Sequence, residues 1–302
     1  MSDAIVVTGE ALVDIVMASD GALTGHPGGG PYNVARTVAR LEQPVAYLGR
    51  ISTDGFGARL RRELEADGVA LDAVVPTDAP TTLALAELDG AGVARYRFYA
   101  DGTSAPGLTL AEATAALPDA PPMLYAGTLG LVFEPIATTL ETLVTRAAPD
   151  TLVALDPNCR PSTIDDPAAY RSRLTRLLRR TDVMKASEED LEWLDPGTAP
   201  VEAARRLIDG GTALITLGGD GAVVVTAREA IEVVAPPVEV VDTIGAGDAF
   251  MGAFLAWWRS NRLSRDDLAD TSRVAEAATF ACRVAAITCS RAGADPPHLS
   301  EL

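Results

Sequence analysis

The sequence has few of the residues on which hydrolases and zinc enzymes depend. Its 302 residues include two histidines, His26 and His298, and three cysteines. No G-x-S-x-G motif is present, so a Ser-His or Cys-His enzyme would have to use one of these two histidines without the nucleophile turn of the α/β-hydrolases. Neither H-E-x-x-H nor a Cys/His cluster occurs, which argues against a zinc site.

Nucleotide-binding and targeting motifs of the common kinds are also missing. The sequence contains no G-x-x-x-x-G-K-[ST], and no G-x-G-x-x-G opens a helix after the first apolar run, which excludes a P-loop and leaves a Rossmann site unsupported. The start, "MSDAIVVTGEALVD", has no basic stretch before a long apolar one, and no segment approaches the ~20 apolar residues of a membrane span. Three cysteines without C-x-x-C fit a reducing compartment. We therefore expect a cytoplasmic protein with no membrane partner.

Positive charge is scarce relative to negative charge. Lysine and arginine together number 25 against 42 acidic residues, and the formal net charge is −17. A field of this sign repels polyanions, so nucleic acid is a poor candidate partner and we expect none. An anionic substrate would need a local positive site.

The order of apolar runs predicts an α/β fold. "AIVVTGEALVDIVM", "VAYLGRIS", "MLYAGTLG", "TLVALDPN" and "TDVMKAS" read as strands, and helical segments separate most of them, which favours parallel pairing. "TTLALAELDGAGVARYRFYADG" instead predicts a hairpin. We predict one domain over residues 1–302, a doubly wound, mostly parallel sheet flanked by helices. A small β-sheet, built from residues near 10–27 and 82–104, should stand apart from it.

The stretch "VDTIGAGDAFMGAF" places three small residues and a carboxylate at the start of a helix. Backbone N–H groups of Gly245, Ala246 and Gly247 would be free donors at the positive end of the helix dipole, and together they form an anion site. Asp248 beside that site would take a proton from a hydroxyl while the N–H groups hold the charge of a transferred phosphoryl group. The alternative is that Asp248 is only an N-cap.

A second glycine cluster, "GGGPYNVA", precedes another helix. Asn33 could cap this helix, or its amide could bind sugar hydroxyls together with the glycine backbone and with Asp14 on the strand before it. The pattern by itself favours the cap.

Three further clusters follow apolar runs. In "ITLGGDGAVVV", Thr216 and Gly218 favour a plain hairpin but could form a wall for a flat ring. In "DPNCRPS", Arg160 could meet a phosphate at the edge where open α/β sheets bind ligands, or pair with Asp165. In "KASEEDLEWL", which begins at Lys185, Ser187 is a good N-cap, and the acids after it could steer hydrated Mg²⁺.

These motifs resemble those of a known family. "GGGPYNVARTVARL" and "DTIGAGDAFMGAF" resemble the two signatures of the ribokinase-like (PfkB) carbohydrate kinases, with matching order, spacing and chain length, so the resemblance covers the whole chain. "DPNCRPS", "KASEED" and "AAITCSRAGADPP" look most like the fructokinase branch. The resemblance implies an ATP-dependent sugar kinase that uses Mg²⁺, with the small β-sheet as a lid over the sugar and as a homodimer contact.

The resemblance also implies roles for individual residues. It makes Asp248 the base, and the backbone of Gly245, Ala246 and Gly247 the anion hole. The residues expected to bind the sugar are Asp14, Gly28, Gly29 and Asn33. Further candidates are Arg160 and the lid residues Tyr96 and Arg97. The nucleotide would lie near Lys185, Thr216, Gly218 and Gly221. A candidate K⁺ site comprises Asp242, Ile244, Arg291 and Gly293. Asp190 matches the acid of the family's N-x-x-E element, which acts on Mg²⁺ through water, although Ser187 stands here in place of the asparagine.

The acceptor stays open at this point. Fructose is the first expectation, and 2-keto-3-deoxygluconate, ribose or a nucleoside are alternatives within the same family. Arg97 would suit an acceptor with a carboxylate, although alternating strands also bury aromatic residues such as Tyr96 and Tyr99 without function. A non-catalytic sugar or nucleotide sensor on the same fold is the alternative from a different class.

Overall fold

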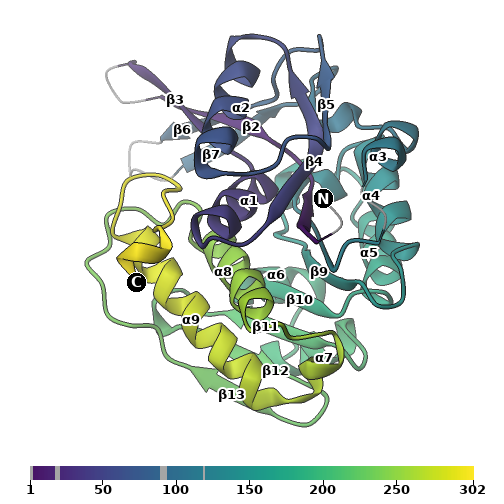
Figure 1. The fold of residues 1–302 in the computed structure, drawn as a ribbon, viewed down its shortest axis with the longest axis vertical. Coiled ribbons are helices and arrows are strands. Elements are labelled where there is room, and N and C mark those ends of the chain that lie inside the picture. Colours follow the sequence, from purple (N-terminus) through teal and green to yellow (C-terminus); the bar gives the residue numbers. More distant parts are fainter. Residues whose placement is uncertain (1–2, 18–20, 89–93, 118–119) are drawn as a thin grey trace.

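Short apolar runs pair in parallel to form the large sheet (Figure 1). The computed structural model describes residues 3–17, 21–88, 94–117 and 120–302. Within them, nine strands lie in the order β13-β12-β11-β10-β9-β8-β1-β4-β5, and only β12 and β13 join through antiparallel pairing. The strands are β1 (Ile5–Thr8), β4 (Val45–Ser52), β5 (Val74–Thr77), β8 (Met123–Gly127), β9 (Leu152–Asp156), β10 (Val183–Ser187), β11 (Thr212–Thr216), β12 (Ala222–Val225) and β13 (Ala230–Val233).

Helices cover both faces of this sheet because successive strand residues point to opposite sides. Ala154 on β9 packs with one group of helices and its neighbour Val153 with the other. The first group is α1 (Gly30–Arg40), α2 (Gly55–Asp67), α8 (Ala246–Ser260) and α9 (Thr271–Cys289). The second is α3 (Leu110–Ala116), α4 (Ile136–Thr145), α5 (Pro167–Leu178), α6 (Glu188–Leu194) and α7 (Pro200–Leu207). The predicted doubly wound fold is confirmed.

A separate small sheet stands at the upper left of Figure 1. Its strands are β2 (Leu12–Met17), β3 (Leu23–Gly28), β6 (Leu83–Leu88) and β7 (Ala94–Tyr99), in the order β3-β2-β6-β7. The antiparallel β6–β7 pair is the predicted hairpin, although its turn at residues 89–93 lies outside the described residues. The glycine-rich stretch is divided between two elements, because Gly28 ends strand β3, Gly29 is the N-cap of α1 and Gly30 begins that helix.

Local chemistry sets most helix boundaries. Asp54 caps α2, and Gly68 ends it in the left-handed conformation. A 3-10 turn over Asp266–Ala269 precedes α9, and Asp270 caps the helix. None of the described helices combines the length and the apolar character that a membrane crossing requires.

Candidate functional site

The chain order reverses between β1 and β8, and this reversal sets the place of the site. From β1 the chain moves outward through β4 and β5, then returns to β8 and moves outward the other way to β13. Open α/β sheets bind ligands in the crevice at the carboxyl ends of strands beside such a reversal. The loops that follow β1, β8, β9 and β10 open on this edge.

Asp248 lies in the first turn of α8 and is 8% exposed. The N-cap of α8 is Gly245, and the Asp248 side chain forms no cap bond, so the N-cap interpretation is wrong. Its Oδ2 accepts a hydrogen bond of 2.8 Å from Nδ2 of Asn33, on α1. Burial raises the pKa of the Asp248 carboxyl, while this hydrogen bond and the charge of Lys185 oppose the rise. The geometry presents a desolvated carboxylate, which is what a general base needs.

Asn33 is placed by the helix that carries it. Helix α1 begins at Gly30 after Gly29 as N-cap, so the prediction that Asn33 caps the helix is wrong. The reason is that the helix starts one turn earlier, at the Gly-Pro pair. The Oδ1 atom of Asn33 is buried without a hydrogen-bond partner among the described residues. A buried acceptor of this kind calls for a donor from a ligand, such as a sugar hydroxyl.

The start of α8 offers free backbone donors. Gly245 has φ 75°, and a Cβ there would lie 2.5 Å from Cβ of Ala294, so only glycine permits this turn. The N–H of Ala246 donates to the carbonyl of Thr243 over 3.3 Å, so the prediction that it is a free donor is wrong. The N–H groups of Gly247 and Asp248 have no acceptor within the described parts of the chain. Two free donors at a helix N-terminus can hold an anion.

Asp14 lies on β2 near Asp248. A Cβ on Gly28 would stand 2.1 Å from Asp14 Oδ2, so this glycine leaves room for the carboxylate. Burial, reinforced by the charges of Asp248 and Glu10, raises the pKa of Asp14 to about 7. The crevice therefore concentrates acidic groups on the side where the sugar is expected.

Glu10, which the sequence analysis did not single out, fastens the crevice. Its carboxylate accepts hydrogen bonds from the N–H groups of Gly30, Thr128 and Gly130 and from Thr128 Oγ1, at 2.5–3.2 Å. It thereby joins the loop after β1 to the loop after β8 and to the start of α1. An acidic residue directly after the first strand was the only indication in the sequence.

Two cations lie close to Asp248. Lys185 Nζ bonds Asp156 Oδ2 over 3.0 Å, and both residues are buried. Arg160 is exposed, and its charge lowers the pKa of Asp248 in opposition to burial. Arg160 donates to the carbonyls of Asn158 and Cys159 rather than pairing with Asp165 among the described residues. It is thus available to an anionic ligand.

Of the four expected nucleotide residues, Lys185 lies on β10, whereas Thr216, Gly218 and Gly221 lie at the end of β11 and in the turn after it. Thr216 ends β11 beside Ser187 of β10, and β11 and β12 form the antiparallel hairpin that the pattern favoured. Gly218 borders open space, whereas a Cβ on Gly221 would lie 2.1 Å from the carbonyl oxygen of Val233. Gly221 therefore lets the backbone after β13 pass close by.

Asp190 is occupied by local hydrogen bonds. Ser187 caps α6 in a capping box with Asp190, as the motif indicated. Asp190 Oδ2 accepts from Ser187 and Oδ1 from the N–H of Cys159, 2.6 Å away, and the side chain is buried. Across the described ranges, no group of three or more His, Cys, Asp or Glu side chains gathers as for a metal ion. These residues do not fit a directly bound Mg²⁺.

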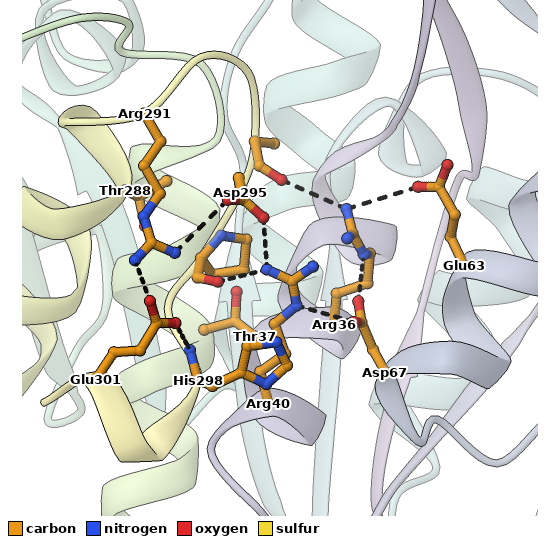
Figure 2. Close-up of polar contacts among 12 residues, drawn as sticks. Arg36, Thr37, Arg40, Glu63, Asp67, Thr288, Arg291, Asp295, His298 and Glu301 are labelled. Carbon is orange, nitrogen blue, oxygen red and sulfur yellow. Dashed lines mark hydrogen bonds and ion pairs between the residues drawn. The ribbon is translucent and has the colours of Figure 1, made fainter.

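The proposed K⁺ loop brings together segments that are about fifty residues apart. Asp242 accepts hydrogen bonds from the N–H groups of Ile244 and Gly293, at 3.0 and 2.9 Å. The guanidinium of Arg291 forms ion pairs with Asp295 and Glu301 (Figure 2).

A polar network holds the tail of the chain against α1 (Figure 2). Arg40 binds Asp67 of α2 at 2.9 Å and Asp295 of the tail at 2.6 Å. Arg36 binds Asp67 at 2.6 Å and the carbonyl of Ala294 at 3.4 Å. Because Ala294 contacts the position of Gly245, this network also fixes the start of α8.

The small sheet divides its side chains between two faces. Strand register pairs Asp14 with Ala84 and Ala84 with Phe98, so these three share a face. Arg97 and Tyr99 alternate with Phe98 and lie on the opposite face, so the prediction that Arg97 binds the sugar held by Asp14 is not supported. Phe98, which packs with Leu12 and Ala84, was missed. The side chain of Tyr96 is outside what the structure describes.

Comparisons with known proteins agree on one family. Residues 2–301 match the model described as pfkB family carbohydrate kinase. The chain is 34% identical over 268 residues to a fructokinase of Rhizobium leguminosarum bv. trifolii, covering 86% of this chain and 81% of the relative. Its fold is similar to that of Xylella fastidiosa fructokinase with bound ATP, with a TM-score of 0.90, 28% identity and coverage of 100% and 97%. It is also similar to Salmonella enterica aminoimidazole riboside kinase complexed with aminoimidazole riboside and an ATP analog, with a TM-score of 0.83, 25% identity and coverage of 97% and 95%.

Proposed function

The chain belongs to the pfkB family of carbohydrate kinases, and we propose that it transfers the γ-phosphoryl group of ATP to a hydroxyl of fructose. One observation carries the proposal. The carboxylate of Asp248 is buried, and Asn33 orients it. The free backbone N–H groups of Gly247 and of Asp248 itself lie in the same helical turn as this carboxylate. A base beside an anion site is the arrangement that phosphoryl transfer to an alcohol requires.

Each part of the crevice has a role in this reaction. Asp248 takes the proton of the attacking hydroxyl, and the N–H groups at the start of α8 stabilise the charge on the phosphoryl group. Asp14, the backbone of Gly28 and Gly29, and the free oxygen of Asn33 bind the sugar hydroxyls. Arg160 meets a phosphate of the nucleotide, whose base lies toward Thr216, Gly218 and Gly221.

ATP enters with Mg²⁺, as is general for phosphoryl transfer, and the ion neutralises phosphate charge. Asp190 would act on that ion only through water, and in competition with its hydrogen bonds to Ser187 and Cys159. The backbone around Asp242, Ile244 and Gly293 forms the K⁺ loop. No step of the proposed transfer depends on either ion being held by these side chains.

The small sheet acts as a lid that excludes water, which would otherwise hydrolyse ATP.

The other face of the small sheet carries an apolar hollow lined by Ile15, Phe56, Leu83, Leu85 and Tyr99. Leu23 at its border is 63% exposed. Apolar surface of this kind favours a second copy as cover, so we propose a homodimer through the lid; light scattering should give twice the 31.4 kDa of one chain.

Assays of a panel of candidate acceptors with ATP and Mg²⁺ test which compound accepts the phosphoryl group. Fructose should give the highest kcat/KM, with a phosphorylated product identified by mass, above ribose, 2-keto-3-deoxygluconate and aminoimidazole riboside. The riboside is included because one structural neighbour binds it. A higher kcat/KM for any other acceptor would overturn the choice of fructose, and no transfer to any of them would favour a non-catalytic sensor.

A further inference from the structure

Lys185 is the only lysine in the sequence. The other basic residues among the 25 are all arginines. Arginine presents a broad and rigid fork of donors, whereas the lysine ammonium is a compact point charge. A chain that otherwise uses arginine, yet keeps one lysine at a buried position, indicates that this position needs a compact cation.

The surroundings of Lys185 show what space that cation occupies. It lies on β10 and is 4% exposed, and its Nζ bonds Asp156, which is fully buried at the end of β9. Nζ also lies 2.9 Å from the point where a side chain on Gly247 would begin. The ammonium is therefore against the first turn of α8, beside the free N–H groups of the anion site.

Burial lowers the pKa of the Lys185 ammonium, but the carboxylates of Asp156, Asp190 and Asp248 outweigh burial and raise this pKa above its usual value, so the cation stays charged here. The ammonium adds a full positive charge to the partial positive charge of the helix N-terminus, and an anion bound at this point would meet both. Asp156 takes one of the three N–H donors of the ammonium. Within the described residues no second acceptor for Nζ is present, so the remaining donors can serve a ligand.

We propose that Lys185 is a catalytic residue that donates hydrogen bonds from Nζ directly to oxygens of the transferred phosphoryl group. In that step the sugar oxygen forms a bond to the γ-phosphorus, and the bond from this phosphorus to the bridging oxygen breaks. ADP leaves with the electron pair, and the hydroxyl proton passes to Asp248. Lys185 stays protonated and stabilises the negative charge of the phosphoryl group while this group lies between the sugar oxygen and the bridging oxygen. This inference rests on the proposed kinase function and adds a side-chain donor to its anion site.

The variant Lys185→Met tests the contact, since it keeps the length of the side chain and removes the charge. We expect kcat with fructose to fall about 10²–10³-fold, the loss typical of one oxyanion donor. Affinity for ADP plus aluminium fluoride and fructose should fall by a similar factor, while affinity for ADP or fructose alone stays near wild type. Equal losses for ADP alone and for the aluminium fluoride complex would overturn the proposal, as would wild-type kcat.

Arg180→Met is the matched control, since it also breaks a cation–aspartate pair. Arg180 bonds Asp182 over 3.0 Å near the opposite ends of strands β9 and β10. We expect a lower melting temperature with unchanged kcat. An equal loss of kcat in both variants would assign the effect to general damage and overturn the proposal.

A second measurement needs only the wild-type chain. With ε-¹³C-labelled lysine, the spectrum contains one lysine signal. Binding of AMP-PNP, which carries a γ-phosphoryl group, should shift this signal more than binding of ADP does, whichever sugar is accepted. Equal shifts would overturn the inference even if Lys185→Met failed to fold. If wild type does not phosphorylate fructose but AMP-PNP gives the extra shift, the acceptor proposal fails and the lysine inference stands.

Discussion

Replacing Glu10 by glutamine should weaken the crevice measurably. Oε1 accepts from the N–H of Gly30 and from Thr128 Oγ1, and Oε2 accepts from the N–H groups of Thr128 and Gly130. The amide NH₂ of glutamine must face one of these pairs. The orientation in which the amide NH₂ faces Thr128 Oγ1 and Gly30 costs less free energy, because the Thr128 hydroxyl can rotate and accept a hydrogen bond from the amide.

The cost follows from counting these bonds. The N–H of Gly30 loses its acceptor, which costs about 1–3 kcal/mol for a buried donor. The two bonds to the remaining oxygen lose their charge assistance, about 1 kcal/mol together. We expect Glu10→Gln to lower the free energy of unfolding by about 2–4 kcal/mol, which corresponds to a fall in melting temperature of roughly 3–6 °C for a chain of this size.

Differential scanning fluorimetry without ligands measures this fall, and Glu63→Gln is the control. Glu63 accepts from Arg59 at 3.1 Å and from the Tyr32 hydroxyl at 3.4 Å, and is partly exposed. Its replacement should cost less than about 1 kcal/mol. Equal melting temperatures for the two variants would refute the role assigned to Glu10.

Two further predictions concern Asp14 and Gly245. The pKa of Asp14 is raised to about 7, whereas an unfolded aspartate titrates near pH 4. The folded chain therefore keeps a proton that the unfolded chain loses, and Asp14 progressively lowers stability as the pH rises from about 4 to 7. The gain in melting temperature of Asp14→Asn over wild type should grow across this range, and a gain independent of pH would contradict it. Gly245→Ala should lower both melting temperature and kcat, because its Cβ would meet Ala294; Gly197→Ala, at the same φ of 75° but in open space, should cost less and leave kcat unchanged. Equal effects of the two glycine substitutions would contradict the clash.

The sequence was sufficient for the fold class because that prediction depends on local patterns. Buried runs such as Val45–Ser52 and the left-handed end of α2 at Gly68 follow from neighbouring residues alone. The small sheet was recognisable because its alternating hairpin interrupts the regular strand–helix order.

The site was recognisable only in part, because its decisive contacts join distant segments. Asn33 and Asp248 are 215 positions apart, and no local pattern reveals that one orients the other. Both were open to interpretation as N-caps, since the true caps, Gly29 and Gly245, lie only four and three positions before them. The bonds of Glu10 to Thr128, across 118 positions, were missed for the same reason. Sheet register, also a tertiary property, places Arg97 on the face opposite Asp14.

The turnover of Asp248→Asn tests the central claim most directly. Asparagine has the same shape and can still accept the hydrogen bond from Asn33, so the crevice should stay intact, but its amide cannot take a proton. We expect kcat for sugar phosphorylation to fall about 10²–10⁴-fold while calorimetry shows sugar affinity near that of wild type. Turnover close to wild type would contradict the assignment of Asp248 as the base and, with it, the mechanism proposed for this crevice.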